Sequence, residues 1–145
     1  MGYETLALAT IRQNVFANLY TLINTNKPSG WNVLAKFPED EASFPCIVID
    51  SANVKPTIVT MDGDGSIVED IDAQIDFYAK VTSGDEMIDV GRDNVMNTFL
   101  TNETTLETYK LYLQEDAFDD STTDIFVVGK QKVRTGSSIV KMGMI

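Results

Sequence analysis

The residues of this sequence that are best suited to chemistry are acidic, and the first group lies in a glycine-rich segment. Asp62–Ser66, with the sequence DGDGS, places side-chain oxygens at alternate positions, as in the first half of an EF-hand calcium loop. The later loop positions require a glycine and a bidentate glutamate, and this chain has Ile67 and Ala73 there. Asp-Gly pairs are also favoured in tight hairpin turns. The segment therefore predicts a hairpin turn rather than a calcium site.

Three further aspartates, Asp70, Asp72 and Asp76, occupy alternate positions of a predicted strand. Alternate residues point to one face of a sheet, so these carboxylates are expected to share that face. Such a row of acids is typical of a solvated surface, and a divalent cation is the less favoured interpretation. We expect neither a metal nor a cofactor.

The chain contains no histidine and a single cysteine, Cys46. Histidine is the side chain most often used as a general base near neutral pH and the commonest metal ligand. Cys46 has no partner for an internal disulfide, and its apolar neighbours indicate a small core residue rather than a nucleophile. Because no catalytic set emerges, we expect the protein not to be an enzyme.

Charge is strongly negative and unevenly distributed. The 22 acidic and 11 basic residues give a net charge of -11, which disfavours binding to nucleic acid or to anionic membranes. Residues 125–145 hold four basic side chains and no acid, so this segment carries +4 and the preceding residues -15. Lysines on an exposed edge strand commonly prevent aggregation. Alternatively, the basic segment complements the acidic face of a second copy.

Hydrophobic spacing identifies the elements that position these residues. Apolar residues recur every three or four positions over 5–24, which predicts a helix, and residues 44–49 form an apolar run typical of a strand buried on both faces. Strict alternation over 70–81 predicts a strand with one core face and one wet, acidic face. Ser83 and Glu86 have the spacing of a capping box, so a second helix is expected from Ser83 to about residue 101, with Gly91 packed closely on the sheet.

The remaining pattern predicts shorter strands and an acidic loop. Strands are expected at residues 31–37, 57–61, 108–114, 125–134 and 138–142, and the acidic loop at residues 115–124. The order implies a single α+β domain over residues 1–145, with two helices packed on one face of a mostly antiparallel or mixed sheet. One parallel crossover runs through the second helix. Residues 126–145 are expected to form a C-terminal edge strand and a tail involved in assembly.

This arrangement resembles the tail terminator, or tail-completion, proteins of long-tailed bacteriophages. The resemblance rests on the long N-terminal helix, the Phe37-Pro38-Glu39 segment, the run Phe44–Ile49, the hairpin, the long alternating strand and the single helix after it. It implies a structural virion protein, assembled in the host cytoplasm, that forms a homo-hexameric ring at the head-proximal end of the tail. The implied partners are the tail tube protein and a head-completion or connector protein, with DNA passing through the lumen without sequence-specific binding.

Two other functions stay open on the sequence alone. A head-completion or connector subunit fits the same composition with different ring neighbours, and a small intracellular ligand-binding α+β module belongs to a different class. If the chain forms a ring, the candidate interface residues are the acids of the hairpin and alternating strand together with the basic residues near the C-terminus. They are Asp62, Asp64, Asp70, Asp72, Asp76, Lys130, Lys132 and Arg134.

Overall fold

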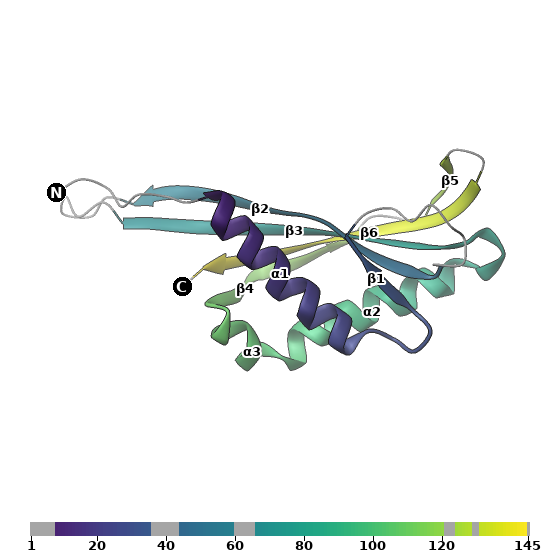
Figure 1. Ribbon diagram of the computed structural model, residues 1–145, viewed down its shortest axis with the longest axis horizontal. Coiled ribbons are helices and arrows are strands. Elements are labelled where there is room, and N and C mark those ends of the chain that lie inside the picture. The colour runs from purple at the N-terminus through teal and green to yellow at the C-terminus, as the bar shows by residue number, and fades with distance from the viewer. Residues whose placement is uncertain (1–7, 36–43, 60–65, 121–123, 129–130, 145) are drawn as a thin grey trace.

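The computed structural model describes residues 8–35, 44–59, 66–120, 124–128 and 131–144 (Figure 1). Within these residues the chain forms three α-helices and six strands, with a short 3-10 turn (η2, Val81–Ser83) before the second helix. The helices are α1 (Leu8–Asn26), α2 (Asp85–Thr101) and α3 (Glu103–Thr108). The strands are β1 (Asn32–Leu34), β2 (Cys46–Val59), β3 (Ser66–Lys80), β4 (Leu111–Asp120), β5 (Asp124–Val128) and β6 (Gln131–Met144).

The strands form one mixed sheet in the order β1-β2-β3-β6-β4, and β5 also pairs with β6. β1 is parallel to β2, whereas all other pairs are antiparallel. Since β3 and β4 are both antiparallel to β6, they run parallel to each other, and the connection through α2 and α3 crosses over β6. These observations confirm the predicted α+β class and the predicted crossover.

The three helices lie on one face of the sheet (Figure 1). The residues of β3 at odd positions from Ile71 to Ala79 are buried and form the core with α1 and α2, as the alternation predicted. Complete burial of one large aliphatic or aromatic side chain contributes about 1.5–3 kcal/mol, so this interface dominates the stability of the fold. The β3 members of this core are Ile71, Ala73, Ile75, Phe77 and Ala79.

Gly91 allows α2 to approach the sheet closely, as predicted. A Cβ atom at this position would lie 2.7 Å from Cη2 of Trp31 and 2.8 Å from Cδ1 of Phe77. The end of α1 is tied to the same helix, because Asn94 Nδ2 donates a 2.8 Å hydrogen bond to the Asn26 carbonyl oxygen. These contacts pack α2 closely on the sheet and tie it to the end of α1.

β2 is buried on both faces near its start, which confirms the prediction for residues 44–49. Ile47 and Ile49 belong to the helix-side core, whereas Cys46 and Val48 form a second cluster on the opposite face. The prediction of two separate strands at residues 44–49 and 57–61 is wrong, because β2 is continuous to Val59. The register shifts between Ile49 and Ser51, which marks a β-bulge. Before the bulge, odd-numbered residues of β2 lie opposite the odd-numbered residues of β3, and after it even-numbered residues of β2 do.

Helix α2 ends at Thr101, as expected, but its predicted capping box is wrong. Ser83 lies in the η2 turn, and the N-cap position is taken by Gly84 (φ 78°), which has no side chain to cap the helix. The acidic residues Asp85 and Glu86 do occupy the first turn, where carboxylates interact favourably with the positive end of the helix.

The C-terminal third differs most from the prediction. Residues 103–108 form the unpredicted helix α3, and residues 115–120, expected in an acidic loop, continue strand β4. The expected single strand at residues 125–134 is two antiparallel strands, because Val128 pairs with Gln131 and the chain reverses between them. The predicted strand at 138–142 is part of the longer β6. The predicted strand at 31–37 contains β1, and its residues 36–37 lie outside the described part of the chain.

Candidate functional site: the open sheet face and the sheet edges

The even-numbered residues of β3 lie on the sheet face opposite the helices, as the alternation predicted. Among the described elements, no helix covers this face (Figure 1). Asp70, Asp72 and Asp76 are half-buried there, together with Gln74 and Tyr78. Three of the predicted interface residues therefore share one open surface of the sheet.

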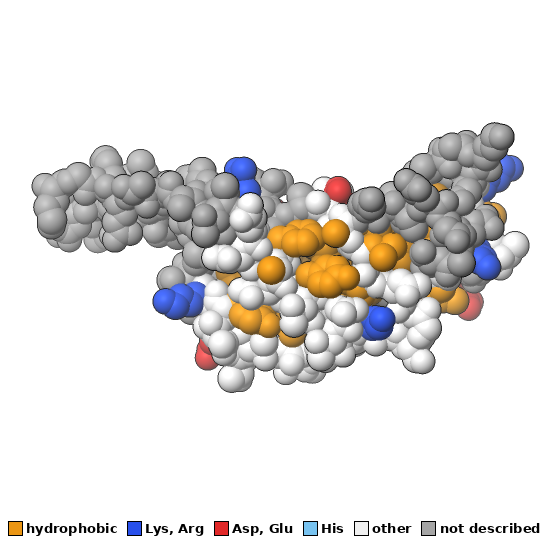
Figure 2. All heavy atoms as spheres, viewed as in Figure 1, with side chains coloured by type: hydrophobic (Ala, Val, Ile, Leu, Met, Phe, Trp, Pro, Cys, Tyr) orange, Lys and Arg blue, Asp and Glu red, His pale blue; other side chains and the backbone are white. Residues whose placement is uncertain are grey.

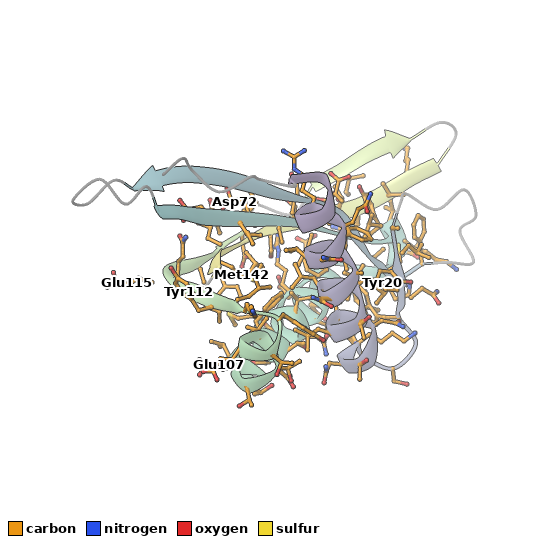
Figure 3. The ribbon with its side chains drawn as sticks, turned by 60° about the vertical axis from the view of Figure 1, so that its left-hand side comes forward. Tyr20, Asp72, Glu107, Tyr112, Glu115 and Met142 are labelled. Carbon is orange, nitrogen blue, oxygen red and sulfur yellow. The ribbon has the colours of Figure 1, made fainter. Side chains whose placement is uncertain are left out.

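Asp70 is held by a glutamine from the edge strand. Gln114 Nε2 donates to Asp70 Oδ1 at 3.0 Å and to the Met142 carbonyl oxygen at 3.2 Å, which links β4, β6 and β3 across this face. The exposed Tyr112 ring lies over Gly143, so that a Cβ atom at Gly143 would collide with the ring and hydroxyl of Tyr112. Figure 3 shows Tyr112 and Asp72 at this end of the sheet.

Asp72 lies directly across from Lys141 in the β3–β6 register. Both side chains are half-buried on the open face, so opposite charges of the acidic row and the basic segment face each other within one chain. Lys141 of the basic segment therefore faces an acidic residue of its own sheet.

The surroundings of Asp76 change the protonation of its carboxyl. Burial raises the pKa of its carboxyl, a hydrogen bond from Gln74 Nε2 (3.4 Å) opposes that change, and the negative charge of Asp50 raises the pKa further. Burial, with the charges of Asp76, Asp50 and Cys46, also raises the pKa of Tyr78 to about 12. Burial alone raises the pKa of the Cys46 thiol to about 12, which confirms Cys46 as a core residue.

Arg134 and Lys132 have different environments, although they lie two residues apart on β6. Lys132 is exposed. Arg134 forms an ion pair with Asp85 in the first turn of α2, and its Nη2 donates a 3.0 Å hydrogen bond to the Val81 carbonyl oxygen. The Arg134 side chain is 17% exposed. Asp62, Asp64 and Lys130 lie outside the described residues.

The edges of the sheet include backbone that the sequence analysis did not identify as an interaction surface. β1 pairs with β2 only at Cys46–Val48, and β6 pairs with β3 only from Asp70 onward. Residues 49–59 and 66–69 therefore have a strand partner on one side only, within the part of the chain that the structure describes. We call residues 51–59 and 66–69 the arm. In its outer part, residues 56–59 pair with residues 66–69 as a two-stranded ribbon, whereas residues 51–55 pair with the part of β3 that also pairs with β6. Figure 1 shows the outer part extending past α1 and the ends of β4 and β6.

The described residues contain no cluster of three or more acidic, cysteine or histidine side chains that could hold a metal ion. None of the described helices has the length and apolar character needed to cross a membrane.

The hydrophobic side chains visible in Figure 2 gather over the body of the molecule, and Phe16 stacks on Tyr20 at a ring distance of 6.3 Å. A shallow groove of about 200 Å³ lies between α3 and β4.

The comparisons with known proteins identify the fold. No protein-family model and no curated protein matches this sequence. Among solved structures, the chain is similar to one from a structure described as "Virion of native gene transfer agent (GTA) particle". The alignment covers 97% of this chain and 98% of that chain, with a TM-score of 0.52 and 11% sequence identity. At this identity, the likeness shows that the two chains share a fold over nearly their whole length.

Proposed function

We propose that this protein is a structural subunit of a phage-like virion, and specifically a tail terminator. In this role, six copies form a ring that closes the tail tube at its head-proximal end and joins the tail to the head. The observation that carries the proposal is the near-complete overlap of this fold with a chain of a virion particle. The element order that resembles tail terminators supports the same assignment.

The charge of the chain suits a ring around DNA. A subunit with a net charge of -11 repels phosphate, so a lumen lined by such subunits lets DNA pass without binding it. The proposed partners are other copies of this chain, the tail tube protein and a connector protein. Structural assembly, rather than catalysis, is the activity that this surface supports.

The proposed charged contacts are between subunits, with Asp70, Asp72 and Asp76 on the acidic side and Lys132 on the basic side. Asp62, Asp64 and Lys130 stay candidates by sequence alone. Arg134 is less suited to a contact between copies, because its guanidinium already contacts Asp85. Exposed ion pairs contribute only about 0–1 kcal/mol each and are screened by salt, so other contacts must supply most of the ring's stability.

Negative-stain electron microscopy with purified tail tubes tests the proposal. Tubes mixed with the protein should carry a six-fold ring at one end and should stop elongating when more tube protein is added. Lys132→Glu should lower the fraction of capped tubes, whereas Lys27→Glu, an equal charge change at another exposed lysine, should not.

Two results would point elsewhere. Rings that bind head connectors but leave tube ends bare would assign the connector role instead. A protein that binds neither particle and stays monomeric would contradict a role in the virion.

A further inference from the structure

The sheet has two open edges that differ in charge. On one side, residues 51–59 of the arm contain Lys55 and no acid. On the other side, β4 contains no basic residue and four acids, Glu115, Asp116, Asp119 and Asp120. Both are edges within the described strands, because the order β1-β2-β3-β6-β4 ends at β4 and β1 covers β2 only up to Val48.

An unpaired strand edge presents backbone N–H and C=O groups that can pair with another strand. The outer part of the arm, residues 56–59 and 66–69, has no third strand, and a two-stranded ribbon alone is only marginally stable in water. Its sequence also favours strand pairing, because Thr57-Ile58-Val59 and Ile67-Val68 are β-branched. Pro56 has no backbone N–H and contributes no donor to strand pairing.

We infer that the arm of one copy pairs with strand β4 of the next copy, so that the sheet continues from subunit to subunit. This inference rests on the proposed ring and names the contact that closes it. The acids of β4 disfavour pairing between the β4 strands of two copies, because like charges repel each other. They favour pairing of β4 with a strand that is neutral or positive. The arm has that character and lies on the opposite side of the same sheet.

The strand directions agree with this pairing. β2 and β6 run in one direction and β3 and β4 in the other, so a neighbour in the same orientation brings its β4 antiparallel to the arm. Antiparallel ladders are the more stable arrangement per residue. The contact joins two different surfaces, and head-to-tail contacts of this kind generate rings when the rotation closes.

The register gives a starting alignment. Ser51 lies opposite Gln74, Gln74 opposite Ile139, and Ile139 opposite Asp119. Lys55 lies opposite Asp70, Asp70 opposite Gly143, and Gly143 opposite Tyr112, so Lys55 and Tyr112 stand at the same level of the sheet. Ser51 and Lys55 of one copy therefore stand at the level of Asp119 and Tyr112 of the next when the copies are not shifted along the strands. The register of β4 shifts between Leu113 and Phe118, so the two positions are separated by an irregular part of β4.

Disulfide cross-linking tests the contact in the full-length protein. Variants with one added cysteine on the arm (Ser51→Cys, Asn53→Cys, Lys55→Cys) are each mixed with Tyr112→Cys or Asp119→Cys, oxidised with copper phenanthroline, and analysed after free thiols are blocked. A bridge within one chain is excluded, because three strand spacings of about 4.8 Å separate the two edges and a disulfide requires Cα atoms within about 7 Å. The native Cys46 is buried and does not compete.

We expect a cross-linked dimer from at least one of the six mixtures, and none when Ser51→Cys is mixed with Asn97→Cys on the exposed side of α2. A double variant should give a ladder of products that ends at the ring. Wild-type assembly with no cross-link in any mixture would overturn the arm contact and leave the ring intact. Cross-links formed by a protein that does not cap tail tubes would support the contact and contradict the proposed function.

Discussion

Arg134 lies on the helix side of β6, where its guanidinium contacts Asp85 and donates to the Val81 carbonyl oxygen. Arg134→Glu should therefore destabilise the monomer by about 1–3 kcal/mol, because it removes charge-assisted hydrogen bonds and places two carboxylates side by side. The strand pattern alone groups Arg134 with Lys130 and Lys132, whereas the structure places Arg134 in a partly buried ion pair and leaves Lys132 exposed.

Urea unfolding of the monomer measures this effect. Lys132→Glu makes the same charge change on the same strand and should leave the unfolding midpoint within error, since Lys132 is exposed. Equal midpoints for the two variants would mean that the Arg134 contact adds nothing to stability.

Asp76 should make stability depend on pH. The pKa of its carboxyl is raised in the folded state, chiefly by burial, so the folded protein binds the proton more tightly than the unfolded chain. The free energy of unfolding contributed by this group therefore falls as pH rises from the unfolded value of 3.8 through the higher folded pKa. Asp76→Asn removes the charged form and should raise the melting temperature at pH 7.

The gain from Asp76→Asn should shrink as pH is lowered and vanish below pH 3.8, where the carboxyl is protonated in both states. Asp93→Asn, at an exposed position of α2, provides the matched control. A gain that is the same at pH 3 and pH 7 would show that the substitution acts through packing and not through the carboxyl's charge.

Cys46 should be inert in the folded protein. Burial raises the pKa of its thiol to about 12, so the reactive thiolate is scarce at pH 8 and the sulfur is out of contact with solvent. We expect a maleimide to label the unfolded chain in minutes and the native protein at the rate of unfolding. Fast labelling of the native protein, followed by mass spectrometry, would contradict the assigned burial.

At the scale of elements, Gly91 determines how closely α2 packs on the sheet. Gly91→Ala should destabilise the protein, because the added methyl group meets Trp31 and Phe77 within 2.8 Å. Overpacking of this kind costs about 1–3 kcal/mol, which exceeds the ~1 kcal/mol that alanine adds to helix stability. Asn97→Ala, on the exposed side of the same helix, should be neutral or stabilising. A more stable Gly91→Ala variant in thermal unfolding would mean that the close contact is absent.

The elements that the sequence predicts correctly are those with one dominant hydrophobic face. Alternation over residues 71–79 identifies β3, because every second side chain enters the same core. The helical spacing of α1 succeeds for the same reason, since Val15, Leu19 and Ile23 all pack on that core. In these elements the local pattern and the tertiary packing agree.

The elements that the sequence predicts wrongly have no dominant hydrophobic face, or the residues that form this face change along the element. β2 appears as two strands because the bulge after Ile49 interrupts the alternation. α3 is short, rich in threonine, and buries only Leu106. β4 is an edge strand whose acidic half reads as a loop, although Phe118 packs against the core. β5 and β6 pair as close as Val128 and Gln131, so the apolar and basic pattern over residues 125–134 spans two strands rather than one.

The candidate site was only partly predictable for a related reason. The row Asp70, Asp72 and Asp76 follows from the alternation, and its shared face needs no tertiary information. The Asp72–Lys141 register and the Arg134–Asp85 contact join residues far apart in the chain, so spacing alone does not indicate them. The open edges depend on where neighbouring strands end, which the sequence pattern does not define.

At the scale of the whole molecule, the structure combines a rigid helix-covered body with an arm and an acidic edge on opposite sides of one sheet. Exposed ion pairs are screened by salt, whereas backbone pairing between strands is much less so. Raising NaCl from about 50 mM to 500 mM, a span over which the Debye length falls severalfold, should therefore weaken assembly without abolishing it. Sedimentation velocity across this series measures the effect, and complete dissociation at high salt would assign the interface to charge alone.

The mass of the native assembly tests the central claim most directly. Native mass spectrometry at micromolar concentrations should give a single dominant species of six chains of 16.0 kDa each. The same sample should show rings of one diameter by electron microscopy. A protein that remains at the mass of one chain across the whole concentration range, with its fold intact, would contradict the account of a ring-forming virion subunit.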